Sequence, residues 1–195
     1  GGEKDRNMLE GFVPFPPEFQ ARYREAGYWE DRLLRDQFAD VFERGGERLA
    51  VIDGEVQVTY SQLNGRAERL ALNLLDLGLR PMDRVVVLLP NKLEFVYLYF
   101  ALQKMGAIPI CALATHRYLE VSQFTEIGGA TACVMPARIR DFEFAPMVER
   151  VQAENPGLKL AIVVGDAPDD FISFQELMER EPESTLADLA AIELD

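Results

Sequence analysis

The residues with the strongest positional argument for chemistry in this sequence are Thr115, His116 and Arg117. They directly follow an apolar run, residues 107–113, which has the pattern of a buried β-strand. In open α/β sheets, ligands bind beyond the carboxyl ends of the strands, near the point where the strand order reverses. A histidine and an arginine there could orient or neutralise an anionic ligand. We therefore interpret His116 and Arg117 as candidate substrate-binding residues. The alternative is that Arg117 pairs with an acid and His116 fills the rim of a polar pocket.

The sequence offers few other groups for catalysis or metal binding. It has no GxxxxGK(S/T) or GxGxxG motif, and the Gly-Gly pairs at 45–46 and 128–129 lack the spacing to wrap a phosphate. It has no GxSxG nucleophile elbow. A single histidine and the absence of CxxC provide no metal-ligand cluster. We therefore predict no catalytic residue and no metal site within these residues.

Composition excludes several classes of partner. The formal net charge of −13 argues against a surface for nucleic acid or for an anionic membrane. No apolar run reaches the ~18 residues that a membrane span needs. Cys111 and Cys133 both stand in apolar, strand-like runs, so we expect two buried free thiols in a reducing compartment. No signal peptide is visible, and the predicted location is the cytoplasm.

The element that must position the candidate residues is a βα repeat between residues 56 and 117. Thr59 and Gln62 fit a capping box, which predicts a helix that ends before Gly78. A β-branched strand is expected over 84–89, then a helix capped by Asn91 or Glu94 and ending at Gly106. The buried strand over 107–113 follows. This alternation predicts a layered α/β/α fold with a mainly parallel sheet and right-handed crossovers.

The sequence divides into four segments. They are probable tag or linker residues (1–7), an N-terminal aromatic and helical arm with the start of a hairpin (8–55), a βα-repeat core (56–165) and a solvated acidic segment (166–195). The further elements expected are helices over 17–26, 33–44, 118–127, 141–154 and 173–180, a hairpin over 49–60 and strands over 131–135 and 160–164. An aromatic strip in the arm is expected to pack onto a larger body; it comprises Phe12, Phe15, Phe19, Tyr23, Tyr28 and Trp29.

Two stretches resemble core motifs of the adenylate-forming enzymes. VTYSQLNGRAERLA is similar to the first motif of that superfamily and LQKMGAIPICAL to the second. FPPEFQARYREAGYW, DRVVVLLPN and ATHR further resemble the stand-alone aryl acid–AMP ligases of siderophore biosynthesis. Thr115 stands where the resemblance leads us to expect serine. The matching positions with structural roles are Thr59, Tyr60, Leu63, Asn64 and Gly106.

The resemblance implies a two-step reaction on an aryl acid, either 2,3-dihydroxybenzoate or salicylate. The acid reacts with Mg-ATP to give aryl-AMP, and the aryl group then passes to the phosphopantetheine thiol of an aryl carrier protein. It also implies that the phosphate loop and the catalytic lysine lie outside these 195 residues. We therefore expect an N-terminal portion of such a ligase that is inactive alone and has no Mg-ATP bound.

Three alternatives remain open at this point. A general acyl- or aryl-CoA ligase would share the two core motifs, although the 12–29 stretch argues against it. A flavodoxin-type or receiver-like signalling module would share the βα alternation. It would require an acidic pair and a phosphoacceptor aspartate, but Asp53 leads into a hairpin turn and no such trio is correctly spaced. The chain could also serve as an interaction module.

Overall fold

A computed structural model describes residues 13–193 of the chain. The predicted linker residues 1–7 and Phe12 lie outside the described residues. The central sheet has five parallel strands in the order β4-β3-β5-β8-β9. Their bounds are β3 (Arg84–Val87), β4 (Ile108–Cys111), β5 (Ala132–Pro136), β8 (Leu160–Val164) and β9 (Ile172–Ser173). The predicted fold class, α/β with a mainly parallel sheet, is confirmed.

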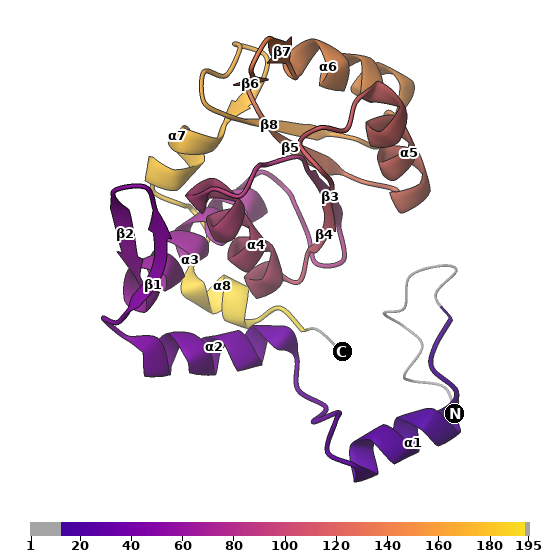
Figure 1. Cartoon of the computed structure of the whole chain (residues 1–195), viewed down its shortest axis with the longest axis vertical. Coiled ribbons are helices and arrows are strands. Elements are labelled where there is room, and N and C mark those ends of the chain that lie inside the picture. Colours follow the sequence, from indigo (N-terminus) through magenta and orange to yellow (C-terminus); the bar gives the residue numbers. More distant parts are fainter. Residues whose placement is uncertain (1–12, 194–195) are drawn as a thin grey trace.

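Two antiparallel hairpins and eight helices complete the part of the chain that the structure describes (Figure 1). The hairpins are β1 (Leu49–Asp53) with β2 (Val56–Thr59), and β6 (Arg138–Ile139) with β7 (Phe142–Glu143). The helices are α1 (Pro17–Glu25), α2 (Leu34–Gly45), α3 (Tyr60–Asp76), α4 (Leu93–Met105), α5 (Tyr118–Gly128), α6 (Ala145–Glu154), α7 (Phe174–Glu179) and α8 (Leu186–Ala190).

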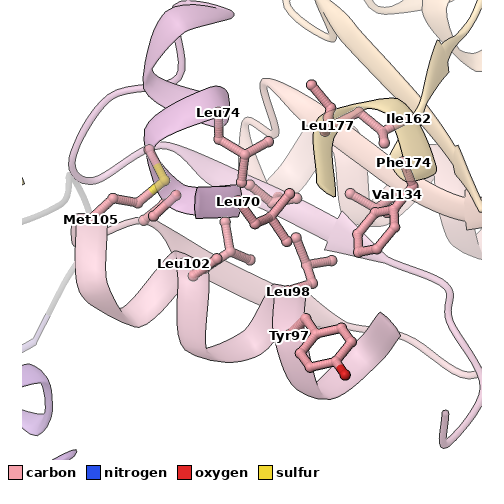
Figure 2. Close-up of a cluster of buried hydrophobic side chains, with 14 of the residues drawn as sticks. Leu70, Leu74, Tyr97, Leu98, Leu102, Met105, Val134, Ile162, Phe174 and Leu177 are labelled. Carbon is pink, nitrogen blue, oxygen red and sulfur yellow. The ribbon is translucent and has the colours of Figure 1, made fainter. Parts of the chain in front are cut away.

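The sheet is buried on both faces because alternate side chains of its strands enter two separate cores. Val85 and Val87 pack with α3, α4 and α7, whereas Val86 and Leu88 pack with α5 and α6. Figure 2 shows side chains of α3, α4, α7 and the sheet meeting in the first core. A parallel sheet covered by helices on both faces requires this kind of continuous apolar strand.

The helix α3 begins as the sequence predicts. The Gln62 N–H donates to the Thr59 hydroxyl at 3.2 Å, and the Thr59 N–H donates to the Gln62 side-chain oxygen at 3.0 Å. This capping box satisfies two N–H groups that the first helical turn leaves without a partner.

The predicted cap of α4 is wrong. Neither Asn91 nor Glu94 caps the helix, and the N-cap residue Lys92 makes no side-chain cap hydrogen bond. The Asp53 carboxylate of the β1–β2 hairpin instead accepts from the Leu93 N–H at 3.2 Å. The sequence pattern missed this cap because it comes from a residue 40 positions away.

The strand β4 is not the buried strand that its apolar sequence predicts. It lies at the edge of the sheet and pairs only with β3 in the described chain, so its side chains are half-buried and Cys111 is exposed. The prediction of two buried thiols is therefore wrong for Cys111. It is correct for Cys133, which is fully buried, and this burial raises the pKa of its thiol to about 12.

The helix predicted over 141–154 starts later than expected. The β6–β7 hairpin occupies residues 138–143, and α6 begins at Ala145. Phe144 is fully buried at the N-cap of α6, with Pro146 at a first-turn position. Phe142 and Glu143, which the prediction placed in the helix, therefore belong to a strand.

The acidic segment is only partly the solvated region that its charge predicts. It contains β9, α7 and α8, and Phe174, Leu177 and Leu189 are buried against the first core. The Asn73 amide of α3 donates to the Leu177 carbonyl at 2.9 Å and to the Arg180 carbonyl at 3.0 Å. The acidic side chains of this segment are mainly exposed. The count of acidic residues therefore gave no sign of the apolar face that packs on the core.

The aromatic strip of the arm packs on itself within the described residues. The Trp29 ring lies 5.4 Å from Phe15 and 5.5 Å from Tyr23, measured between centroids, with edge-to-face geometry. No residue of α1 is buried, and Figure 1 shows this helix away from the sheet. The packing onto a larger body that we expected is thus not made within these residues.

Candidate functional site

The carboxyl ends of β3, β4 and β5 form a topological switch point. The connection from β3 to β4 contains α4, which lies on one face of the sheet, whereas those after β4 and β5 contain α5 and α6 on the other. β4 and β5 lie on either side of β3. The chain therefore leaves β3 toward one face of the sheet and leaves both of its neighbours toward the other face. That is where open α/β sheets bind ligands. The Thr115–Arg117 loop follows the carboxyl end of β4, as the sequence predicts, and its role in binding stays a prediction.

His116 holds the loop in shape, because both its backbone and its side chain form hydrogen bonds with Leu113. Its N–H donates to the Leu113 carbonyl at 2.9 Å, and its Nδ1 accepts from the Leu113 N–H at 3.2 Å. The imidazole ring also contacts Phe124 at 5.3 Å between centroids. Since Nδ1 acts as acceptor, a neutral imidazole carries its proton on Nε2. Only Nε2 remains for a ligand, and the contacts of His116 with Leu113 mainly fix the shape of the loop.

Arg117 fixes the loop against the β6–β7 hairpin. Its Nη1 donates to the carbonyls of Ala114 at 3.1 Å and His116 at 2.8 Å. The guanidinium carbon lies 3.9 Å from the centre of the Phe142 ring. The acid partner that we considered as an alternative is not found among the described residues. A guanidinium has five N–H donors, so Nε and Nη2 keep donors for a ligand.

The N-terminus of α5 follows the loop at once. The Arg117 N–H donates to the Glu120 carboxylate at 3.0 Å. This hydrogen bond, with a second from the Glu120 N–H, holds the pKa of the Glu120 carboxyl below its ordinary value, so the carboxylate is ionised at neutral pH. The first turn of α5 is thereby anchored to the loop.

A surface hollow of about 530 Å³ separates the loop from the β6–β7 hairpin. Thr115 and Arg117 line it from one side, and Arg140 and Asp141 from the other. Arg140 is exposed and has a φ of 54°, a conformation rare outside glycine. The sequence prediction assigned no element to residues 136–140 and therefore missed Arg140. Two short alternating runs around Arg140-Asp141 were the available signal for a hairpin.

No metal site can be assigned within residues 13–193. No three His, Cys, Asp or Glu side chains gather there in an arrangement that could hold an ion. We therefore derive no step through a metal from these residues. The described helices also include none long and apolar enough to cross a membrane.

Comparison with known proteins identifies the family. Residues 38–192 match the model of the AMP-binding enzymes. The chain is 37% identical over 190 residues to the 2,3-dihydroxybenzoate-AMP ligase of Bacillus subtilis, covering 96% of this chain and 35% of that protein. It is 40% identical over 174 residues to the salicyl-AMP ligase / salicyl-S-ArCP synthetase of Mycobacterium tuberculosis, covering 87% of this chain and 31% of that protein.

A solved structure agrees with these relatives. The apo structure of MbtA from Mycobacterium smegmatis superposes with a TM-score of 0.80 and 37% identity, over 88% of this chain and 32% of that one. The chain spans about a third of the length of the proteins it matches. Both core motifs recognised in the sequence lie within the matched range, and the chain belongs to the family of AMP-binding enzymes.

Proposed function

We propose that this chain is the N-terminal part of an aryl acid–AMP ligase that activates 2,3-dihydroxybenzoate or salicylate. The observation that carries this proposal is the 37% identity to a 2,3-dihydroxybenzoate-AMP ligase over 96% of the chain. That alignment includes the aromatic arm, most of which lies outside the range of the family model. The arm was also the feature that favoured aryl acid ligases over general acyl-CoA ligases.

The proposed reaction has two steps. A carboxylate oxygen of the aryl acid attacks the α-phosphorus of ATP, an acyl–phosphate bond forms, and pyrophosphate leaves. The thiol of a carrier-protein phosphopantetheine then attacks the carbonyl carbon, and AMP leaves with the bonding electron pair. Both steps develop negative charge on phosphate oxygens, so positioned cations and N–H groups accelerate them. The proposed setting is the cytoplasm.

Within this scheme the chain supplies part of the substrate site rather than the catalytic groups. We assign His116 and Arg117 to its border because they lie at the switch point of the sheet. The remaining donors of Arg117 would neutralise an anionic substrate, while its carbonyl contacts keep the loop rigid. The 195 residues alone are expected to be inactive.

ATP–pyrophosphate exchange with the full-length enzyme tests the proposal. Exchange should depend on salicylate or 2,3-dihydroxybenzoate and stay at background with benzoate or a fatty acid. A second assay compares an aryl carrier protein with CoA as the thiol acceptor. Exchange driven by fatty acids, or faster transfer to CoA, would favour a general acyl-CoA ligase instead.

A further inference from the structure

We propose that the hollow between the Thr115–Arg117 loop and the β6–β7 hairpin binds the phosphate group of a phosphate ester, through Arg140 and Arg117. Arg117 follows β4 and Arg140 follows β5, the two strands that flank β3, so both arginines lie at the carboxyl edge of the sheet. The inference deepens the proposed function but can be tested without it.

Arg140 is the observation that first indicates a ligand. It makes no hydrogen bond or ion pair with any residue that the structure describes, although the protein carries 33 acidic residues and a net charge of −13. Neighbouring Arg138, in contrast, pairs with Glu143 across the hairpin. Arg140 also holds a left-handed backbone conformation that costs free energy for a residue with a Cβ atom. An unpaired arginine in a strained turn beside a hollow is thus available for an external anion.

Arg117 supplies the second cation, already held in place. Two carbonyl contacts and the Phe142 ring at 3.9 Å fix its guanidinium before any ligand arrives, so little side-chain entropy remains to be lost. The Thr115 hydroxyl lies in the same lining and can donate to an anion.

The geometry favours phosphate over a carboxylate. One arginine fork matches the two oxygens of a carboxylate, whereas a phosphate presents more oxygens and up to two charges to a pair of guanidiniums. An aryl acid would also need an enclosed apolar slot for its ring, because small-molecule sites bury most of the ligand. Thr115, Arg140 and Asp141 on the rim are exposed, which suits a charged group. Ala114, Ile139 and Phe142 then leave an apolar surface for the organic part of an ester.

Binding can be measured on the 195-residue chain with inorganic phosphate as the probe. The side-chain Nε–H signals of arginine are followed by NMR at constant ionic strength, with acetate as the reference anion. We expect saturable shifts of the Arg117 and Arg140 signals with phosphate and weaker ones with acetate. Equal shifts with both anions, or no saturable shift with phosphate, would overturn the proposal.

A matched pair of variants distinguishes a specific phosphate site from a general effect of positive charge on anion binding. Arg140→Gln should weaken phosphate binding about threefold or more, the size of one exposed ionic contact. Arg138→Gln removes the same charge from the same hairpin but from a side chain that lines a different hollow, and should leave binding unchanged. Asp141→Asn should tighten binding, because it removes a carboxylate from the lining. Equal weakening by the Arg138 and Arg140 variants would show a diffuse field rather than a site.

Two phosphate esters, AMP and phosphopantetheine, take part in the proposed reaction. Competition with bound inorganic phosphate shows which of them the hollow binds. AMP and phosphopantetheine are each titrated against bound phosphate. Competition by either supports the site and names the compound that supplies the ester. Competition by neither would overturn the assignment to phosphate esters. This result is independent of pyrophosphate exchange, so the site and the proposed function can fail separately.

Discussion

The Asp53 carboxylate accepts a hydrogen bond from the Leu93 N–H at 3.2 Å and pairs with the Lys92 ammonium at 3.0 Å. A side chain in the β1–β2 hairpin thus caps α4, the helix that carries Tyr97 and Leu98 into the first core. The Lys92 hydrogen bond and that of the Leu93 N–H hold the pKa of Asp53 below its ordinary value. The hairpin is therefore coupled to the βα repeat rather than merely preceding it.

Removal of this cap should loosen the first turn of α4. Asp53→Ala is expected to speed hydrogen exchange of the Leu93 amide while leaving amides at the centre of α4 unchanged, because only the end of the helix loses its partner. Glu55→Ala, an exposed acid in the same hairpin, serves as the control. Unchanged protection of Leu93 would mean that the Asp53 contact does not hold the helix end.

A second prediction concerns the capping box of α3. Thr59→Ala should lower the free energy of unfolding by about 1 kcal/mol, the usual contribution of an N-cap side chain. Urea denaturation should then show a lower midpoint at unchanged slope. Ser61→Ala, at an exposed position two residues on, is the control. An unchanged midpoint for the Thr59 variant would contradict a helix start at this residue.

The third prediction is a pH dependence that comes from Asp76 of α3. Its side chain is only 6% exposed and accepts from the backbone N–H groups of Glu183 at 2.8 Å and Ser184 at 2.9 Å. Burial alone would raise the pKa of Asp76, but the hydrogen bonds from the Ser184 hydroxyl and these N–H groups lower it below its ordinary value. A lowered pKa means that the carboxylate stabilises the fold above the unfolded-state value and loses this effect as pH falls through the folded-state value.

Urea midpoints should therefore fall as pH is lowered below about 4, the ordinary value for aspartate. Asp76→Asn should flatten that part of the curve and should destabilise the protein at pH 7 by about 1–3 kcal/mol, because the Glu183 and Ser184 N–H groups lose a charged acceptor. Glu181→Gln is the control, since its side chain is 84% exposed beside Arg69. Parallel pH curves for the parent chain and the Asp76 variant would rule out this linkage.

The sequence predicted most of the core elements because their signals are local. The Thr59–Gln62 capping box, the β-branched run before Leu89 and the glycine after α3 each act within a few residues. The switch-point position of Arg117 also followed from the order of strands and helices. Features that depend on contacts distant in sequence were missed, as the cap from Asp53 and the edge position of Cys111 illustrate.

The candidate site was only half predictable for the same reason. His116 and Arg117 follow a strand, so their location could be inferred from the sheet. The opposite wall could not, because the helix predicted over 141–154 took in Asp141 and both residues of β7. Similarly, ten acids concealed the apolar face of the segment after residue 165, where Phe174 and Leu177 are buried.

A fourth prediction is self-association of the 195-residue chain. Leu113, Leu119 and Ile127, around the edge strand β4 and α5, are 65%, 71% and 85% exposed. Exposed apolar surface of this kind favours association. Static light scattering should show a mean mass that rises with concentration, and Leu119→Lys with Ile127→Lys should reduce the rise. Leu34→Lys on α2 is the control. A monomer at all concentrations would contradict the prediction.

The last prediction separates the binding role of Arg117 from its structural role in the full-length enzyme. Arg117→Ala removes two hydrogen bonds to the loop carbonyls, so a loss of about 1–3 kcal/mol of stability is expected. If Arg117 also borders the substrate site, pyrophosphate exchange should fall about tenfold or more beyond the loss explained by unfolded protein. Arg117→Lys keeps the charge but lacks the planar fork. It should therefore restore part of the exchange while leaving the loop weakened. Melting curves measured beside exchange rates give both quantities. Proportional losses in stability and exchange for both variants would assign Arg117 a structural role only.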